Sequence, residues 1–240
     1  MVPGSRVETP RIGRSLYGYW CIQSMRTTAR HLTPISDVLS RTASLLLNVF
    51  SASKGESYDL ELEQPVTIRL ATPLSVLPPS PPPGGNTPSV MWWSLKLRYW
   101  VWKVERQQSQ PQADIKVFVL YHDPKLVSSL PHSLGLQKGL IGVVHAFSSA
   151  HMSESNNVVI AHEIMHTVGA SDKYDTKSGQ PIYPDGYAEP KLKPRYPQSK
   201  AEIMGGRIPV TEKEASIPRN LSQTTVGQRT ALEIGWLTSD

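Results

Sequence analysis

Two histidines and a glutamate stand together in the short sequence HEIMH, which runs from His162 to His166. On an α-helix, residues four apart project from the same face, so the two imidazoles would point in one direction. Two neutral imidazoles at this spacing can bind one zinc ion, and Glu163 would lie beside a water molecule held there. The alternative interpretation is an ordinary helix with a solvated polar face.

The residues that follow the motif favour the metal site. Gly169 comes three residues after His166, where a helix that turns sharply needs a residue that tolerates left-handed backbone angles. If the chain reverses there, Asp172 can return toward the metal as a third ligand. Glu189 and Glu202 are rival third ligands, but neither lies in a helical pattern and Asp172 has the spacing. The apolar flanks VVIA and IM predict that the other faces of the helix are buried.

The segment HEIMHTVGASD resembles the zinc signature H-E-x-x-H-x-x-G-x-x-H of the metzincin metallopeptidases. Asp172 replaces the third histidine, as in the snapalysin-type members of this clan. Met204, followed by two glycines in AEIMGGRIP, resembles the methionine turn that lies beneath the metal in these enzymes. The resemblance covers roughly residues 88–240, and residues 1–77 have no counterpart in it.

The resemblance implies a zinc-dependent endopeptidase that acts on a peptide or protein substrate. In such an enzyme His162, His166 and Asp172 hold Zn²⁺, and Glu163 is the general base for a metal-activated water. The resemblance also favours a secreted or periplasmic location, although residues 1–14 show no signal-peptide pattern. The alternatives are a catalytically silent peptide- or protein-binding module on the same fold, and a structural zinc domain.

Several further residues are candidates for the same site. Asp175 is either an acceptor that orients a ligand histidine or an aspartate that caps a loop. Several metzincins have a tyrosine two positions after the turn methionine, where this chain has Gly206, so four loop tyrosines are possible substitutes: Tyr174, Tyr183, Tyr187 and Tyr196. A basic cluster either selects acidic substrates or is a solvated loop: Lys191, Lys193, Arg195, Lys200 and Arg207.

The pattern of apolar residues predicts the elements that position these side chains. We expect helices at 35–50, from Thr87 onward, after a cap at Ser155, Asn156 or Asn157, and at 222–235. We expect strands around 66–70, at 113–122 and, as an edge strand carrying His145, at 139–149; an extended peptide can pair with such an edge. Residues 169–211 are expected to form a long loop. This order predicts an α/β (α+β) fold, a metzincin-like zincin domain with a mixed sheet, an active-site helix and a C-terminal helix.

The composition limits the other possibilities. The proline-rich segment 78–88 divides an N-terminal extension or subdomain, residues 1–77, from a catalytic domain at residues 89–240. A single cysteine, Cys21, excludes an internal disulfide and a cysteine-based zinc site. No apolar stretch is long enough for a membrane span. The net charge of +5 is spread along the chain without a nucleic-acid-binding motif, so we expect no nucleic-acid partner.

Overall fold

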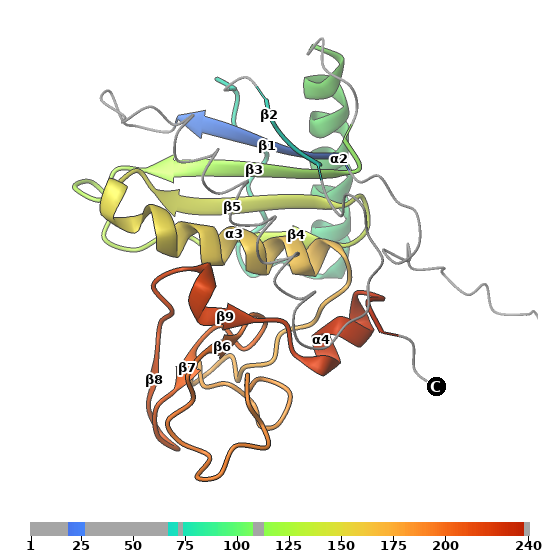
Figure 1. The fold of residues 1–240 in the computed structure, drawn as a ribbon. Helices are drawn as coiled ribbons and strands as arrows, with labels where there is room; N and C mark the ends of the chain where they lie inside the picture. Colours follow the sequence, from blue (N-terminus) through green and yellow to red (C-terminus); the bar gives the residue numbers. More distant parts are fainter. Residues whose placement is uncertain (1–18, 27–66, 72–73, 108–112, 238–240) are drawn as a thin grey trace, which may run out of the picture.

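The computed structural model describes residues 19–26, 67–71, 74–107 and 113–237 of the 240-residue chain. For the first two of these segments it describes the course of the backbone, together with the side chain of Ala71. The helix expected at residues 35–50 lies outside the described residues. Figure 1 shows one sheet with helices packed on it, and a C-terminal half with little regular structure on the far side of one helix.

The sheet has five strands in the order β2-β1-β3-β5-β4. Four of them run parallel, and they are β1 (Tyr19–Arg26), β2 (Thr67–Leu70), β3 (Ile115–His122) and β5 (Ile141–Phe147). The fifth strand, β4 (Leu134–Leu136), pairs antiparallel with β5. The α/β (α+β) class with a mixed sheet is therefore confirmed.

The edge strand is β4, and the prediction that residues 139–149 form the edge is wrong. Strand β5 pairs with β3 on one side and with β4 on the other, so its backbone groups are already used. The sequence did not reveal β4 because it is three residues long and has Gly135 at its centre. Such a short strand has no alternation that a pattern could detect.

Helices cover both faces of the sheet because both faces of β3 are apolar. Helix α2 (Thr87–Arg106) packs on one face, and its buried residues contact the β3 and β5 side chains Phe118, Leu120, Ile141 and Val143. Helix α3 (Ser153–Thr167) packs on the other face, against Val117, Val119 and Val144. Successive strand residues point to opposite faces, which assigns 117 and 119 to one helix and 118 and 120 to the other.

The N-terminal ends of both helices differ slightly from the sequence expectations. Helix α2 is capped by Asn86, whose side-chain oxygen accepts the backbone N–H of Ser89, and not by Thr87. Helix α3 begins at Ser153, before the expected cap residues. Asn156 instead bonds to both the N–H and the carbonyl of Phe147, which fastens the first turns of α3 to the end of β5.

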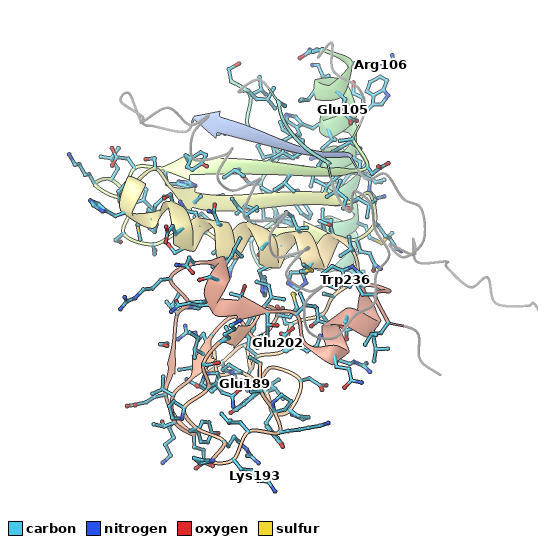
Figure 2. The ribbon with its side chains drawn as sticks, viewed as in Figure 1. Glu105, Arg106, Glu189, Lys193, Glu202 and Trp236 are labelled. Carbon is cyan, nitrogen blue, oxygen red and sulfur yellow. The ribbon has the colours of Figure 1, made fainter. Side chains whose placement is uncertain are left out.

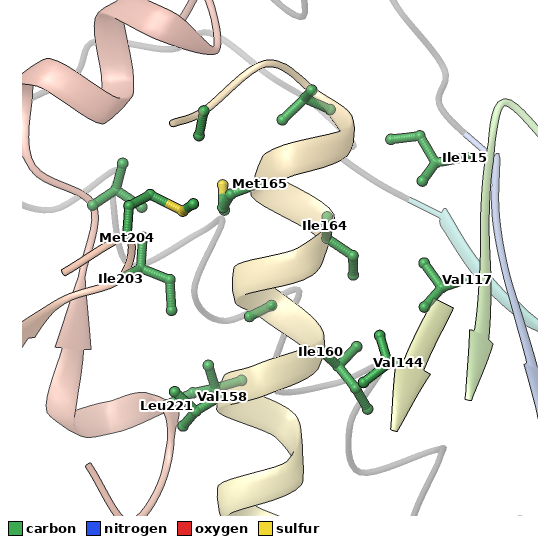
Figure 3. Close-up of a cluster of buried hydrophobic side chains, with 14 of the residues drawn as sticks. Ile115, Val117, Val144, Val158, Ile160, Ile164, Met165, Ile203, Met204 and Leu221 are labelled. Carbon is green, nitrogen blue, oxygen red and sulfur yellow. The ribbon is translucent and has the colours of Figure 1, made fainter. Parts of the chain in front are cut away.

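The C-terminal half packs on the side of α3 that faces away from the sheet. Figure 3 shows Ile203, Met204 and Leu221 on one side of α3, and Ile115, Val117 and Val144 on the other. The expected long loop, residues 169–211, contains two short strands, β6 (Ala201–Glu202) and β7 (Ile208–Pro209). Each pairs with a strand that follows the loop: β6 with β9 (Thr224–Thr225) and β7 with β8 (Ala215–Ser216). The last helix is shorter than expected, since α4 spans Gln228–Glu233.

Candidate metal centre

Helix α3 carries His162, Glu163 and His166 at the boundary between the core and solvent. The positions next to them, Ile160, Ala161, Ile164 and Met165, are fully buried and fix the rotation of the helix. The two histidines are partly exposed and lie one helical turn apart on the same face, as their spacing predicts. Helix α3 therefore presents both imidazoles from a rigid, buried support.

The chain reverses immediately after α3, at Gly169. The φ angle of Gly169 is +107°, a conformation that glycine adopts without strain. A side chain there would also approach the Gln137 amide to 2.9 Å. The backbone N–H groups of Gly169 and Ala170 donate to the carbonyls of His166 and Met165, which closes the helix end. The reversal directs Asp172 back toward the histidines, as expected from the sequence.

Three side-chain atoms converge at the site. Asp172 Oδ1 lies 3.2 Å from His162 Nε2 and 3.2 Å from His166 Nε2. The two Nε2 atoms are 3.1 Å apart. These three residues form a group that could hold a metal ion, and Glu189 and Glu202, the rival third ligands, do not belong to it.

The hydrogen bonds on the outer side of the rings show why this arrangement suits a cation. His162 Nδ1 lies 2.9 Å from the Ile203 carbonyl, and His166 Nδ1 lies 2.8 Å from the Ala170 carbonyl. A carbonyl oxygen only accepts, so each Nδ1 must carry the hydrogen and each neutral ring directs the lone pair of Nε2 inward. Two nitrogen lone pairs and a carboxylate oxygen then face one another at about 3 Å, and a bound cation removes this repulsion.

The spacing of the three atoms fits zinc. Ligand distances of about 2.0–2.1 Å in a tetrahedral site place the ligand atoms about 3.3–3.4 Å apart, close to the observed 3.1–3.2 Å. Among the described residues these three supply the ligand atoms, which leaves one tetrahedral position without a protein ligand. In such sites a histidine ligand usually donates its other ring N–H to a backbone carbonyl or a carboxylate, as both histidines do here.

The charges of the three residues are strongly coupled in the protein without a metal ion. Burial raises the pKa of Asp172, but hydrogen bonds that the Nε2 atoms donate when the histidines are protonated lower it by more, so its pKa lies well below the ordinary value. Burial lowers the pKa of His166, but Asp172 and the Ala170 carbonyl raise it overall. The carboxylate therefore stays ionised wherever the histidines are available to bind a cation.

The methionine predicted to lie beneath the site is fully buried. Met204 packs in the same core cluster as Met165 of α3, and Figure 3 shows the two side chains facing each other. Its carbonyl accepts the N–H of Lys173, next to Asp172, and the preceding carbonyl, of Ile203, is the one that orients His162. The segment around Met204 thus contacts one member of the group, His162, and the residue that follows another member, Asp172, through its backbone.

A buried carboxylate holds this turn, and sequence reasoning assigned it no such role. Glu202 Oε2 accepts the N–H groups of Met204 and Gly205 at 2.7 and 2.8 Å. Its Oε1 accepts the N–H of Gly227 at 3.0 Å and the hydroxyl of Thr230 at 2.7 Å. Glu202 is fully buried and connects the turn to the start of α4 (Figure 2). The signal available in the sequence was a glutamate inside an otherwise apolar run.

An ion pair that the sequence analysis did not predict holds the residues beside Asp172. The Lys173 ammonium is buried and lies 2.6 Å from Glu233 Oε2 on α4. Glu233 also accepts the N–H and hydroxyl of Ser171. Burial raises the pKa of Glu233, but the bonds from Lys173 and Ser171 lower it overall. Residues on both sides of Asp172 are therefore tied to the C-terminal helix.

Glu163 is largely buried, although it stands beside the two histidines. Burial raises its pKa, while the neighbouring His162 and His166 oppose the shift. His132, on the loop before β4, also interacts electrostatically with Glu163. A carboxylate whose pKa is raised accepts a proton more readily, which suits it to accept and return one.

The four loop tyrosines separate into two groups. The ring of Tyr174 lies 6.2 Å from that of His162, and burial and the charge of Asp172 raise the pKa of its hydroxyl. Tyr183, Tyr187 and Tyr196 form a cluster of their own, in which the hydroxyls of Tyr187 and Tyr196 lie 2.9 Å apart. Of the four tyrosines, Tyr174 is therefore the one with described contacts to the histidines and aspartate of the metal centre.

The remaining predicted residues have other contacts. Asp175 accepts the N–H groups of Lys177 and Ser178 and the Ser178 hydroxyl, so its contacts are those of an aspartate that caps a loop. His145 lies 2.8 Å from His122 of β3, ring nitrogen to ring nitrogen. Three cations of the basic cluster, Lys191, Lys193 and Arg195, line an open cavity of about 850 Å³ together with Tyr183, Tyr196 and Glu212.

Comparisons with known proteins do not identify a family for this chain. No protein-family model matches the sequence, and no curated protein matches it. Among solved structures, wild-type OgpA from Akkermansia muciniphila aligns with 12% sequence identity and a TM-score of 0.37. The alignment covers 96% of this chain and 62% of OgpA, so the chain spans less than two thirds of that protein. A TM-score this low does not establish a common fold.

Proposed function

We propose that the protein is a zinc-dependent endopeptidase of the metzincin type. The observation that carries the proposal is the convergence of three lone pairs, from His162, His166 and Asp172, beside the buried carboxylate of Glu163. Such a group is stable when it holds a cation and leaves a position open for a water molecule. A structural zinc site would instead be closed by four protein ligands.

The residues of the site have separate parts in this chemistry. When bound, zinc acts as a Lewis acid that lowers the pKa of a water molecule and polarises a carbonyl oxygen. Glu163 accepts the proton of the attacking water and returns it to the nitrogen of the leaving amine. The Ile203 and Ala170 carbonyls hold the imidazoles in the tautomer that binds a metal.

Strand β4 is suited to orient the substrate. Among the described strands it pairs with β5 alone, so its other edge is available to an extended peptide. It also lies against α3, since a side chain at Gly135 would meet the Glu163 carbonyl and His166 Cβ at 2.4 Å each. A peptide added to this edge would run beside the metal group, and we propose it as the substrate-binding strand.

We propose two further assignments. Tyr174 takes the place of the tyrosine that follows the turn methionine in several metzincins, because its ring lies beside His162. Strands β1 and β2, which lie within residues 1–77, belong to the catalytic domain, because they form one sheet with β3 and β5.

The test compares wild type with Glu163→Gln. Both proteins are stripped of metal with a chelator and reloaded with Zn²⁺, and both zinc stoichiometry and cleavage of a mixed peptide library are measured. We expect one zinc ion in each, and a loss of cleavage of about 10²–10⁴-fold in the variant, because removing a general base costs that much. Glu154→Gln is the matched control, since Glu154 is an exposed glutamate on the same helix.

The outcomes separate the endopeptidase from a silent binding module. Cleavage by wild type that requires zinc and is lost in Glu163→Gln supports the endopeptidase. Zinc-loaded wild type that binds library peptides and releases no fragments would identify the binding module. Equal cleavage by wild type and Glu163→Gln would contradict the assignment of Glu163 as the base.

A further inference from the structure

Helix α2 has two apolar faces, and the sheet uses one of them. Trp93, Leu97, Val101 and Val104 are buried toward the sheet. A second set of apolar residues lies on the opposite side of the helix with 47–64% of each residue exposed: Met91, Trp92, Leu95, Tyr99 and Trp102. We call this second set the outer stripe. Monomeric proteins rarely expose so many large apolar side chains together, so an outer stripe of this kind marks a surface that binds something.

The positions of the outer stripe form a continuous band. Residues 91, 95, 99 and 102 follow one another at intervals of four, four and three, which keeps them on one side of an α-helix. The rings of Tyr99 and Trp102 stack with their centroids 5.6 Å apart. The 20-residue helix lies flat on the sheet, so the whole length of the band faces outward together.

The charged residues of α2 make this surface positive. Lys96 lies 5.4 Å from the centre of the Trp92 ring, and the Arg106 guanidinium lies 4.3 Å from that of Trp102. Lys103 is also exposed. The single carboxylate of the helix, Glu105, forms an ion pair with Lys116 of β3 at 3.3 Å, so it does not neutralise these cations.

We propose that the outer stripe of α2 binds the surface of an anionic lipid bilayer. Tryptophan and tyrosine rings with flanking lysine and arginine are the composition of helices that lie in the interface plane, with apolar side chains below the headgroups and cations beside them. Anionic headgroups match the unneutralised charges of Lys96, Lys103 and Arg106. No described helix is long and apolar enough to cross a membrane.

The test uses the full chain and lipid vesicles. Cosedimentation is measured with vesicles of phosphatidylcholine alone and with vesicles that contain about one third phosphatidylserine. We expect binding to the anionic vesicles, and a decrease of at least about tenfold in the partition coefficient for Leu95→Gln/Trp102→Gln and for Lys96→Glu/Lys103→Glu. Brominated acyl chains should quench the tryptophan fluorescence of wild type and quench that of Leu95→Gln/Trp102→Gln less.

Three controls distinguish membrane binding by the outer stripe from nonspecific adsorption of exposed apolar residues, from misfolding and from dimerisation. Leu126→Gln changes an apolar residue that is 68% exposed and lies outside α2, so its binding should equal that of wild type. Zinc stoichiometry should be the same in all variants, because α2 and the metal group lie on opposite faces of the sheet. Absence of binding to anionic vesicles, or undiminished binding by both double variants, would overturn the proposal. So would a wild-type dimer in sedimentation velocity that Leu95→Gln/Trp102→Gln converts to a monomer, since the stripe would then bind a second copy.

Discussion

Replacement of Glu202 by glutamine tests whether one buried carboxylate holds the turn at Met204. The carboxylate accepts four hydrogen bonds, two at each oxygen, and no solvent reaches it. Glutamine has nearly the same shape but offers one acceptor oxygen and one amide NH₂ group. In either orientation the NH₂ group of the glutamine faces two groups that donate to the carboxylate in wild type, so donor faces donor.

The expected loss of stability follows from these contacts. The better orientation directs the NH₂ toward Thr230, whose hydroxyl can rotate to accept, and leaves the Gly227 N–H without a partner at about 1–3 kcal/mol. The bonds from Met204 and Gly205 remain but lose the charge of their acceptor, at about 1 kcal/mol each. We therefore expect Glu202→Gln to lower the free energy of unfolding by about 3–5 kcal/mol, a large part of the total for a domain.

Urea unfolding of the zinc-free proteins, followed by circular dichroism, measures this loss. The matched control is Glu189→Gln, because the carboxylate of Glu189 also accepts from a backbone N–H and a hydroxyl, both on Ser199, but is exposed. We expect the control to change stability by less than about 1 kcal/mol. Burial raises the pKa of Glu202, and its four hydrogen bonds oppose that shift. A loss below about 1 kcal/mol for Glu202→Gln would refute the idea of an ionised carboxylate that holds the turn.

Three other perturbations have defined outcomes. Gly135→Ala should weaken zinc binding as well as stability, because its methyl group would displace His166; unchanged zinc affinity in a competition titration would contradict the close approach of β4 and α3. Glu233→Gln should destabilise the protein above about pH 5, and the difference from wild type should shrink as the pH falls through the lowered pKa of Glu233, because protonation there removes from wild type the ion pair with Lys173 that the variant lacks at every pH. A difference that stays constant from pH 7 to pH 3 in urea titrations would argue against that ion pair. Leu97→Ala should lower the free energy of unfolding by about 2–5 kcal/mol in urea titrations, since Leu97 is fully buried between α2 and the sheet; a loss below about 1 kcal/mol would show that this face is loosely packed.

Local patterns in the sequence were sufficient for the elements with strong periodicity. The almost continuous apolar run of β3 and the spacing of Trp93, Leu97, Val101 and Val104 identify a buried strand and a helix, because each pattern reflects burial on defined faces. Because the prediction depended on such patterns, it missed β4, which is too short to have one, and therefore placed the edge of the sheet at residues 139–149. Helix ends were displaced by one to several residues, because side chains such as Asn156 bond to other elements instead of capping their own.

By itself, the sequence determined which three residues converge as a group that could hold a metal ion. The interval of four between His162 and His166, and the glycine that lets the chain reverse before Asp172, are local properties of a helix and its end. Tertiary structure alone decided what surrounds that group: the hydrogen bond between His162 and the Ile203 carbonyl, the hydrogen bonds that Glu202 accepts from the turn at Met204, and the ion pair of Lys173 with Glu233. The first and the last of these contacts join residues 41 and 60 positions apart, and the second depends on the direction in which the Glu202 side chain of β6 points. The spacing of residues along the chain carries no information about contacts between distant residues or about the direction of a side chain.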